Sequence, residues 1–203
     1  MKRSPANPAA TQRATRGAQA RELRIVAGRW RGRRLRFPAA SPIRPTPDRV
    51  RETLFNWLRG RIEGAHCLDL FAGSGALGLE ALSRGAADVV FVETDAAAVR
   101  ALRALLAEWG GSGGSVVQTD AARFLGQAAR AFDLVFLDPP FAAGLLPDTC
   151  ARLAAGGWLA PGARVYLERA RREPAPGLPA AWRELRSGKA GEVSYHLYEC
   201  GSG

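Results

Sequence analysis

The stretch Cys67-Leu68-Asp69-Leu70-Phe71-Ala72-Gly73-Ser74-Gly75-Ala76-Leu77-Gly78 decides the fold of this chain. Four of its first five residues are apolar, which makes a run of strand length, and the glycines that follow mark a tight turn. From Ala76 to Arg84 the sequence continues with residues typical of a helix. A strand, a glycine-rich turn and a helix in this order begin a βαβ unit.

The same alternation continues along the chain. Further strands are predicted at 88–93, 115–119, 133–137 and 163–168. Helices are predicted at 96–109 and 121–131, and such alternation places strands in parallel through right-handed crossovers. Two final strands, at 182–187 and 193–200, are joined by a turn at 188–191, which favours an antiparallel pair. We therefore predict an α/β fold with a Rossmann-like, doubly wound, mainly parallel sheet and an antiparallel C-terminal edge hairpin.

Two further parts are expected ahead of this main domain, which covers 64–203. Residues 1–22 contain almost no large apolar side chains, so we expect a disordered basic tail. An organellar transit peptide has a similar composition and remains an alternative. Residues 23–63 are predicted to form a small β-hairpin, with arms at 23–27 and 34–37, and a helix with Thr46 as its N-cap.

Positive charge is concentrated at the N-terminal end. Residues 1–61 hold 16 Lys or Arg against three acids, whereas the remainder carries 13 basic and 16 acidic residues. This asymmetry indicates a polyanionic partner, most simply nucleic acid. At the hairpin tip, arginines suit phosphate contacts while Trp30 could stack on a base. The predicted RNA-binding residues are Arg29, Trp30, Arg31, Arg33 and Arg34. The alternative is a solvated turn with Trp30 folded back onto the body.

The cysteines and the hydropathy pattern exclude several classes of protein. Cys67, Cys150 and Cys200 are far apart and match no metal motif, so we expect reduced thiols in a cytoplasmic protein and no metal site. No apolar run reaches the length of a membrane span, and no signal-peptide apolar region follows the basic start.

The glycine turn predicts a cofactor site. Gly73 to Gly78 fits the pattern G-x-G-x-x-G, which sites for NAD, FAD and S-adenosylmethionine share. Asp69 is placed to accept hydrogen bonds or neutralise an ammonium group, and Glu93 ends the next strand, where a carboxylate can bind ribose hydroxyls. Asp120 ends the third strand and suits either an adenine amino group or the N-cap of the next helix. The predicted cofactor-binding residues in this region are Asp69, Phe71, Ala72, Gly73, Ser74, Gly75, Glu93, Asp120 and Ala121.

The residues Asp138-Pro139-Pro140-Phe141 follow the strand at 133–137 and form the predicted catalytic site. The amino group of a nucleobase is a poor nucleophile, because its lone pair is drawn into the ring. The Asp138 carboxylate and the Pro139 carbonyl can each accept one N–H and so favour a pyramidal amine that faces a methyl donor. Pro140 helps to fix the carbonyl direction, and Phe141 offers a face on which an extruded base can stack.

These segments together resemble the class I S-adenosylmethionine-dependent methyltransferases, and specifically the bacterial family that methylates guanine N2 in 16S ribosomal RNA. The resemblance is carried by residues 24–32, 44–58, 68–84 and 138–141 and extends from about Leu23 to Cys200. Segments 24–32 and 44–58 are the specific ones, since the other two are shared with many amino-methylating enzymes.

The resemblance implies a cofactor, a substrate and further site residues. It implies S-adenosyl-L-methionine as cofactor and, as substrate, 16S rRNA in the small ribosomal subunit or its assembly intermediate. It implies a monomeric cytoplasmic enzyme that does not act at a membrane. It also implies that the helix from Thr46 helps to enclose the cofactor, which makes Arg49 and Arg51 further cofactor-binding candidates.

Three alternatives remain open at this point. An adenine-N6 methyltransferase of RNA or DNA would use the same Asp-Pro-Pro-Phe tetrad. A nicotinamide-dependent oxidoreductase would use the glycine motif but gives no reason for the tetrad. A non-catalytic RNA-binding assembly factor would explain the basic N-terminal end alone.

Overall fold

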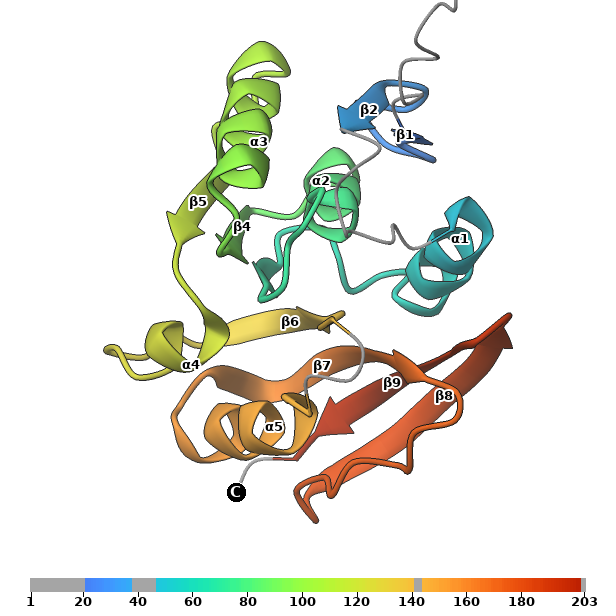
Figure 1. Cartoon of the computed structure of the whole chain (residues 1–203), viewed down its shortest axis with the longest axis vertical. Coiled ribbons are helices and arrows are strands. Elements are labelled where there is room, and N and C mark those ends of the chain that lie inside the picture. Colours follow the sequence, from blue (N-terminus) through green and yellow to red (C-terminus); the bar gives the residue numbers. More distant parts are fainter. Residues whose placement is uncertain (1–20, 38–46, 141–143, 202–203) are drawn as a thin grey trace, which may run out of the picture.

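The computed structural model describes residues 21–37, 47–140 and 144–201 of the chain. These residues form a seven-stranded sheet with helices on both faces and a separate two-stranded sheet near the N-terminus (Figure 1). Most of the predicted tail, the N-cap candidate Thr46 and the catalytic candidate Phe141 lie outside the described residues. No helix in the described part of the chain is long and apolar enough to cross a membrane.

Five parallel strands make up most of the large sheet. They are β3 (His66–Asp69), β4 (Asp88–Glu93), β5 (Gly114–Gln118), β6 (Phe132–Leu137) and β7 (Leu159–Ala170). β9 (Val193–Cys200) pairs antiparallel with β7, and β8 (Trp182–Ala190) pairs antiparallel with β9. The strand order is β5-β4-β3-β6-β7-β9-β8. The predicted parallel sheet with an antiparallel C-terminal edge is therefore confirmed.

Two apolar clusters hold helices on the two faces of the sheet. α1 (Asp48–Trp57), α2 (Ala76–Ser83) and α3 (Ala96–Glu108) contribute buried side chains to one cluster. α4 (Ala121–Phe124) and α5 (Leu146–Ala155) contribute to the other. Side chains alternate between the faces along a strand, so Phe136 belongs to the first cluster and Leu137 to the second. The sheet is thus doubly wound, as predicted.

The helices of the second face differ from the prediction. The helix predicted at 121–131 ends at Phe124, because Phe124 and Leu125 are buried while residues 126–131 are exposed and present no apolar face. α5 has no counterpart among the predicted elements. Its buried residues Leu146, Cys150 and Leu153 recur at helical spacing, and α5 supplies the crossover from β6 to β7.

Two strands are longer than predicted. β7 begins at Leu159 and ends at Ala170, beyond both ends of the predicted range 163–168. β8 continues to Ala190, which pairs with Val193, so the chain reverses at residues 191–192 and not over 188–191. Long antiparallel pairing with β9 extends both strands.

The N-terminal hairpin consists of β1 (Arg21–Arg24) and β2 (Arg34–Phe37), which pair antiparallel. β1 therefore begins inside the predicted tail and ends before the predicted end of the first arm at residue 27. The arm ends early because the backbone N–H groups of Val26 and Ala27 donate to the side chain of Glu80 on α2.

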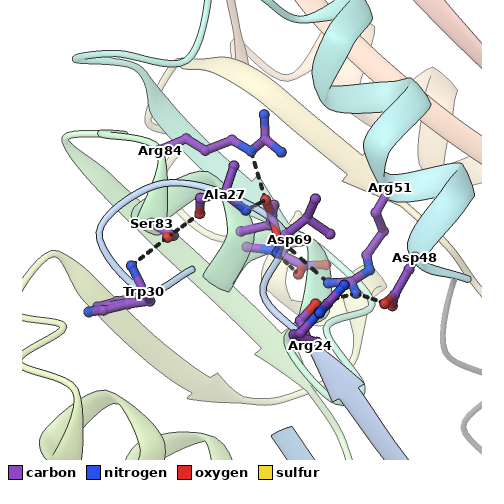
Figure 2. A network of polar contacts seen from close by, with 11 residues as sticks. Arg24, Ala27, Trp30, Asp48, Arg51, Asp69, Ser83 and Arg84 are labelled. Carbon is purple, nitrogen blue, oxygen red and sulfur yellow. Dashed lines mark hydrogen bonds and ion pairs between the residues drawn. The ribbon is translucent and has the colours of Figure 1, made fainter. Parts of the chain in front are cut away.

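Glu80 fixes the hairpin to the main domain. Its carboxylate has no exposed surface and accepts hydrogen bonds from Val26 N at 2.8 Å and Ala27 N at 3.0 Å. Arg84 Nε donates to the same carboxylate at 2.7 Å, and Arg51 Nη1 of α1 lies 3.7 Å from it. Figure 2 shows this network between the loop after β1, α1 and α2. Three separate segments therefore contact the same buried carboxylate.

We expect Glu80→Ala to lower the free energy of unfolding by about 3–5 kcal/mol, because it leaves the Val26 and Ala27 N–H groups without an acceptor and removes one of the two carboxylates paired with the buried Arg51. Urea denaturation of both proteins measures the difference. Glu52→Ala, at an exposed position of α1, is the control and should change stability by no more than about 0.5 kcal/mol. A loss for Glu80→Ala as small as that of the control would contradict the role of this carboxylate.

Candidate active site

The two predicted motifs meet where the winding of the sheet reverses. β3 pairs in parallel with β4 on one side and with β6 on the other. The helix after β3 packs on one face, and the helix after β6 packs on the opposite face. Open α/β sheets bind ligands in the crevice at the carboxyl ends of such strands. The glycine turn follows β3 and Asp138 follows β6, so both stand at this edge of the sheet.

The glycine turn brings backbone close to any ligand at this edge. Gly75 is the N-cap of α2 with φ of 76°, a left-handed conformation that glycine adopts without strain. A Cβ atom on Gly78 would lie 2.2 Å from the Phe91 ring, so α2 packs directly against β4. Ala72 is buried, whereas Phe71 and Ser74 are half-buried at the turn. The strand, glycine turn and helix therefore follow one another as the sequence predicts, while their contact with a cofactor stays a prediction.

Asp69 is a buried acid behind the turn. Its side chain is 2% exposed and accepts a hydrogen bond from Gly78 N at 3.0 Å. Burial raises the Asp69 pKa from its ordinary 3.8 to about 7, the Gly78 N–H opposes this rise, and the nearby Glu93 adds to it. A cationic group at this edge would favour the ionised form of Asp69.

Glu93 links the loops that follow β3 and β4. Its carboxylate accepts hydrogen bonds from Gly73 N at 2.7 Å, Thr94 N at 2.7 Å and Asp95 N at 2.8 Å. The Thr94 hydroxyl donates to it as well, at 3.2 Å. A carboxylate has about four acceptor positions, so the predicted ribose contact requires Glu93 to share or release one of these bonds.

Asp120 caps the short helix after β5. It accepts a hydrogen bond from Arg123 N at 2.8 Å and lies 3.3 Å from Arg123 Nε. The N-cap interpretation is therefore confirmed, while the contact with an adenine amino group stays a prediction. Ala121, the first residue of α4, is half-buried beside it.

Asp138, Pro139 and Pro140 leave the end of β6. Asp138 is half-buried, Pro139 is buried and Pro140 is exposed. The two prolines end the strand, since neither can donate to a sheet ladder. They also line a cavity of about 370 Å³. Its other lining residues are Gly144, Leu145, Leu146, Pro147, Glu168, Arg169, Glu173, Pro174, Ala175, Pro176 and Gly177.

Two predicted site residues have structural roles instead. Arg51 has no exposed side-chain surface, and its Nη2 donates to Arg24 O at 2.6 Å and to Asp48 at 2.5 Å. The prediction that Arg51 holds the cofactor is therefore wrong, because its guanidinium is enclosed by protein. Arg49 lies exposed on the same helix, and its role stays a prediction.

Trp30 is the second correction. It is 3% exposed, its Nε1 donates to Trp109 O at 3.0 Å, and the two indole rings lie 5.5 Å apart. Trp30 therefore folds back onto the body, and the prediction that it stacks on a base is wrong. Figure 2 shows its backbone held by Ser83, whose hydroxyl accepts from Trp30 N and donates to Ala27 O.

The arginines of the hairpin tip lie on the surface. Arg29, Arg31, Arg33 and Arg34 are all exposed. Arg29 lies over the Trp30 ring at 4.4 Å, and Arg34 pairs with Glu22 at 2.6 Å. Their contact with RNA stays a prediction, and Trp30 is not available to stack on a base beside them.

Comparisons with known proteins agree with this geometry. Residues 23–199 match the family model described as "Conserved hypothetical protein 95". The chain is 48% identical to the ribosomal RNA small subunit methyltransferase D of Escherichia coli, over 88% of this chain and 90% of the relative. The chain belongs to this methyltransferase family. The methyltransferase D of Haemophilus influenzae is 42% identical, over 88% of this chain and 94% of that protein.

Solved structures of family relatives share the fold. The Escherichia coli protein yhhF superposes with a TM-score of 0.83 at 46% identity and covers 90% of this chain and 99% of its own. A Haemophilus influenzae protein superposes with a TM-score of 0.76 at 41% identity, over 89% and 99% of the two chains.

Asp69→Asn should remove a pH dependence of stability. The folded-state pKa of Asp69 is about 7, above its ordinary 3.8, so folding favours the protonated form. The contribution of Asp69 to the free energy of unfolding is therefore constant below about pH 4, falls by at most about 1.4 kcal/mol per pH unit as pH rises to about 7, and then levels off. Asn cannot ionise, so the variant does not show this decrease in the free energy of unfolding.

Urea denaturation of the unliganded proteins across this pH range measures the effect. The stability of the Asn variant relative to the wild type should rise between about pH 4 and pH 7. A difference that stays constant over this range would contradict the raised pKa of Asp69.

Proposed function

We propose that this chain transfers a methyl group from S-adenosyl-L-methionine to the exocyclic N2 amine of a guanine in 16S rRNA of the small ribosomal subunit. The observation that carries the proposal is the position of Asp138 and Pro139 at the end of β6, directly beside the strand that leads into the glycine turn. A methyl donor in the glycine cradle and an amine at Asp138 would then meet at one sheet edge.

The residues of the cradle fit the donor. A bound S-adenosyl-L-methionine supplies a methyl group activated by a positively charged sulfur. The glycine turn would let its amino-acid part approach the backbone, and the buried Asp69 would offset its ammonium charge. Glu93 would bind the ribose hydroxyls, and Asp120 would accept from the adenine amino group. Asp69 and Glu93 end two neighbouring parallel strands, and Asp120 lies two residues after the next one.

Asp138 and Pro139 would make the weakly nucleophilic guanine amine more reactive. Asp138 and the Pro139 carbonyl would each accept one N–H of the guanine amine, which turns the nitrogen lone pair out of the ring plane toward the methyl carbon. Positive charge develops on this nitrogen as its bond to carbon forms and the carbon–sulfur bond breaks. The sulfur leaves as a neutral thioether, and the nitrogen then loses one N–H proton to give the neutral methylamine. The Asp138 carboxylate would stabilise that charge, and its half-buried position partly shields it from water. Phe141, next in the sequence, would stack on the extruded base.

The choice of ribosomal RNA rests on the relatives. Proteins 48% and 42% identical to this chain are named as ribosomal RNA small subunit methyltransferases. The exposed arginines of the hairpin tip support an RNA partner, because they form a basic surface on an otherwise mildly acidic main domain. The amine-binding geometry alone would serve an adenine N6 amine equally well.

Asp138→Asn should lower kcat for methyl transfer by about 10²–10³-fold, because a neutral amide stabilises the developing positive charge less than a carboxylate. The dissociation constant for S-adenosyl-L-methionine should stay unchanged, since Asp138 acts on the base. Methyl transfer to small subunits and calorimetric cofactor binding give the two values.

Asp133→Asn is the matched control, because Asp133 lies at the opposite end of β6 and accepts from His66 N at 2.8 Å. It should retain the wild-type kcat. Normal methyl transfer by Asp138→Asn would overturn the assigned role of Asp138.

Replacing Arg29, Arg31, Arg33 and Arg34 together with Ala should weaken RNA binding and flatten its salt dependence. Each lost phosphate contact should reduce the slope of log K against log salt by about 0.7–0.9. The four side chains are exposed at the hairpin tip, so cofactor affinity should not change. RNA affinities measured over a range of salt concentrations test this. A slope equal to that of the wild type would show that the hairpin does not contact phosphates.

A further inference from the structure

A second carboxylate lies beside Asp138 at the edge of the sheet. Leu137 of β6 pairs with Leu167 of β7 in a parallel register, so the next residues, Asp138 and Glu168, are neighbours. Adjacent strands lie about 4.8 Å apart. The Glu168 side chain projects from the face that carries Tyr166, because residues two apart along a strand share a face. Asp138 lies near the same tyrosine, since its charge contributes to the raised pKa of Tyr166.

Glu168 is held in a fixed orientation. It is 3% exposed, and the Tyr166 hydroxyl donates a hydrogen bond to its Oε1 at 2.7 Å. Burial and the nearby Glu168 raise the Tyr166 pKa well above its ordinary value, so the hydroxyl stays a donor. On the other side, Tyr195 of β9 stands opposite Glu168 in the sheet register. A side chain held in one orientation, as Glu168 is, is suited to recognise a ligand.

Glu168 also lines the cavity at the catalytic prolines. The cavity of about 370 Å³ has apolar walls that include Pro139, Pro140, Leu145 and Pro174. Apolar walls with a few fixed polar groups are typical of a pocket for a planar ligand such as a nucleobase. The Tyr166 hydroxyl already donates to one oxygen of Glu168, and a carboxylate can accept further hydrogen bonds, which a base offers along its Watson–Crick edge.

We propose that Glu168 selects guanine at the active site by accepting a hydrogen bond from guanine N1–H, while Asp138 and Pro139 hold the N2 amine. This inference rests on the proposed function and deepens it. Guanine carries N1–H directly beside its N2 amine, so two neighbouring acceptors on β6 and β7 match two neighbouring donors on one base edge. Tyr166 is a positioning residue that orients Glu168.

The same arrangement rejects adenine. The ring nitrogen N1 beside the adenine amine carries a lone pair and no hydrogen. Placed at Glu168, that lone pair would face a carboxylate oxygen, and a buried acceptor would lose its donor. A site built to accept a hydrogen bond discriminates strongly against a substrate that lacks the donor. The Asp138-Pro139-Pro140 segment can bind any exocyclic amine, whereas Glu168 would determine which base the site accepts.

The test compares guanine with 2-aminopurine at the methylated position of the small-subunit RNA. 2-Aminopurine keeps the amine at carbon 2 but has an unprotonated N1. The wild type should have a kcat/KM for guanine at least about 100-fold above that for 2-aminopurine. Glu168→Gln should lose activity mainly on guanine, so that this ratio falls at least about tenfold. Tyr166→Phe should lower the ratio less, because Glu168 keeps its charge but loses its orienting donor.

Glu199→Gln is the control, because Glu199 lies on β9 opposite Arg164, at the far end of the β7–β9 pair from Glu168. It should leave the ratio unchanged. An equal loss on both bases in Glu168→Gln would show that Glu168 only supports the fold, and would overturn the inference. A wild-type protein that methylates no guanine at all would instead overturn the proposed function, so the two failures are distinguishable.

Discussion

The buried carboxylate of Glu80 is the interaction on which the arrangement of this protein depends. A charge with no exposed surface is costly unless it has polar or charged partners, and Glu80 has them from three segments. The loop after β1 supplies two backbone N–H groups, α1 supplies the charge of Arg51, and the C-cap of α2 supplies Arg84. Because α2 is the helix that starts at the glycine turn, the N-terminal hairpin is attached to the same helix that we propose binds the cofactor.

The second constraint is the register of three neighbouring parallel strands. β3 ends at Asp69 and the glycine turn, β6 ends before Asp138, and β7 carries Glu168 at the matching height. Methyl donor and acceptor base would therefore be positioned by adjacent backbone segments of one rigid sheet. Reactions between two bound molecules depend strongly on such positioning. The register of the core thus determines which side chains face the reacting amine.

The sequence predicts the features that depend on local pattern. Apolar runs and glycines locate the parallel strands and the turn, and the position of Asp138 after β6 follows from two prolines that end the strand. Partners far apart in the chain were not predictable in this way. Trp30 pairs with Trp109, 79 residues later, and nothing near Trp30 in the sequence indicates this.

Some missed features did leave a signal in the sequence. Glu80 stands within Ala76–Ser83, a helix buried along its whole length, and an acid in so apolar a segment indicates a buried partner. That partner includes Arg51, which the family resemblance had indicated as a cofactor-binding candidate. The selecting role proposed for Glu168 needs the pairing of β6 with β7, which only the folded sheet supplies.

The identity of the methylated nucleoside tests the central claim most directly. Small ribosomal subunits from cells that lack this protein can be incubated with the purified chain and S-adenosyl-L-methionine labelled on its methyl group. The RNA is then digested, and the labelled nucleoside is identified by mass spectrometry. Our account predicts label in N2-methylguanosine from 16S rRNA. Label in N6-methyladenosine, or in no nucleoside, would contradict it.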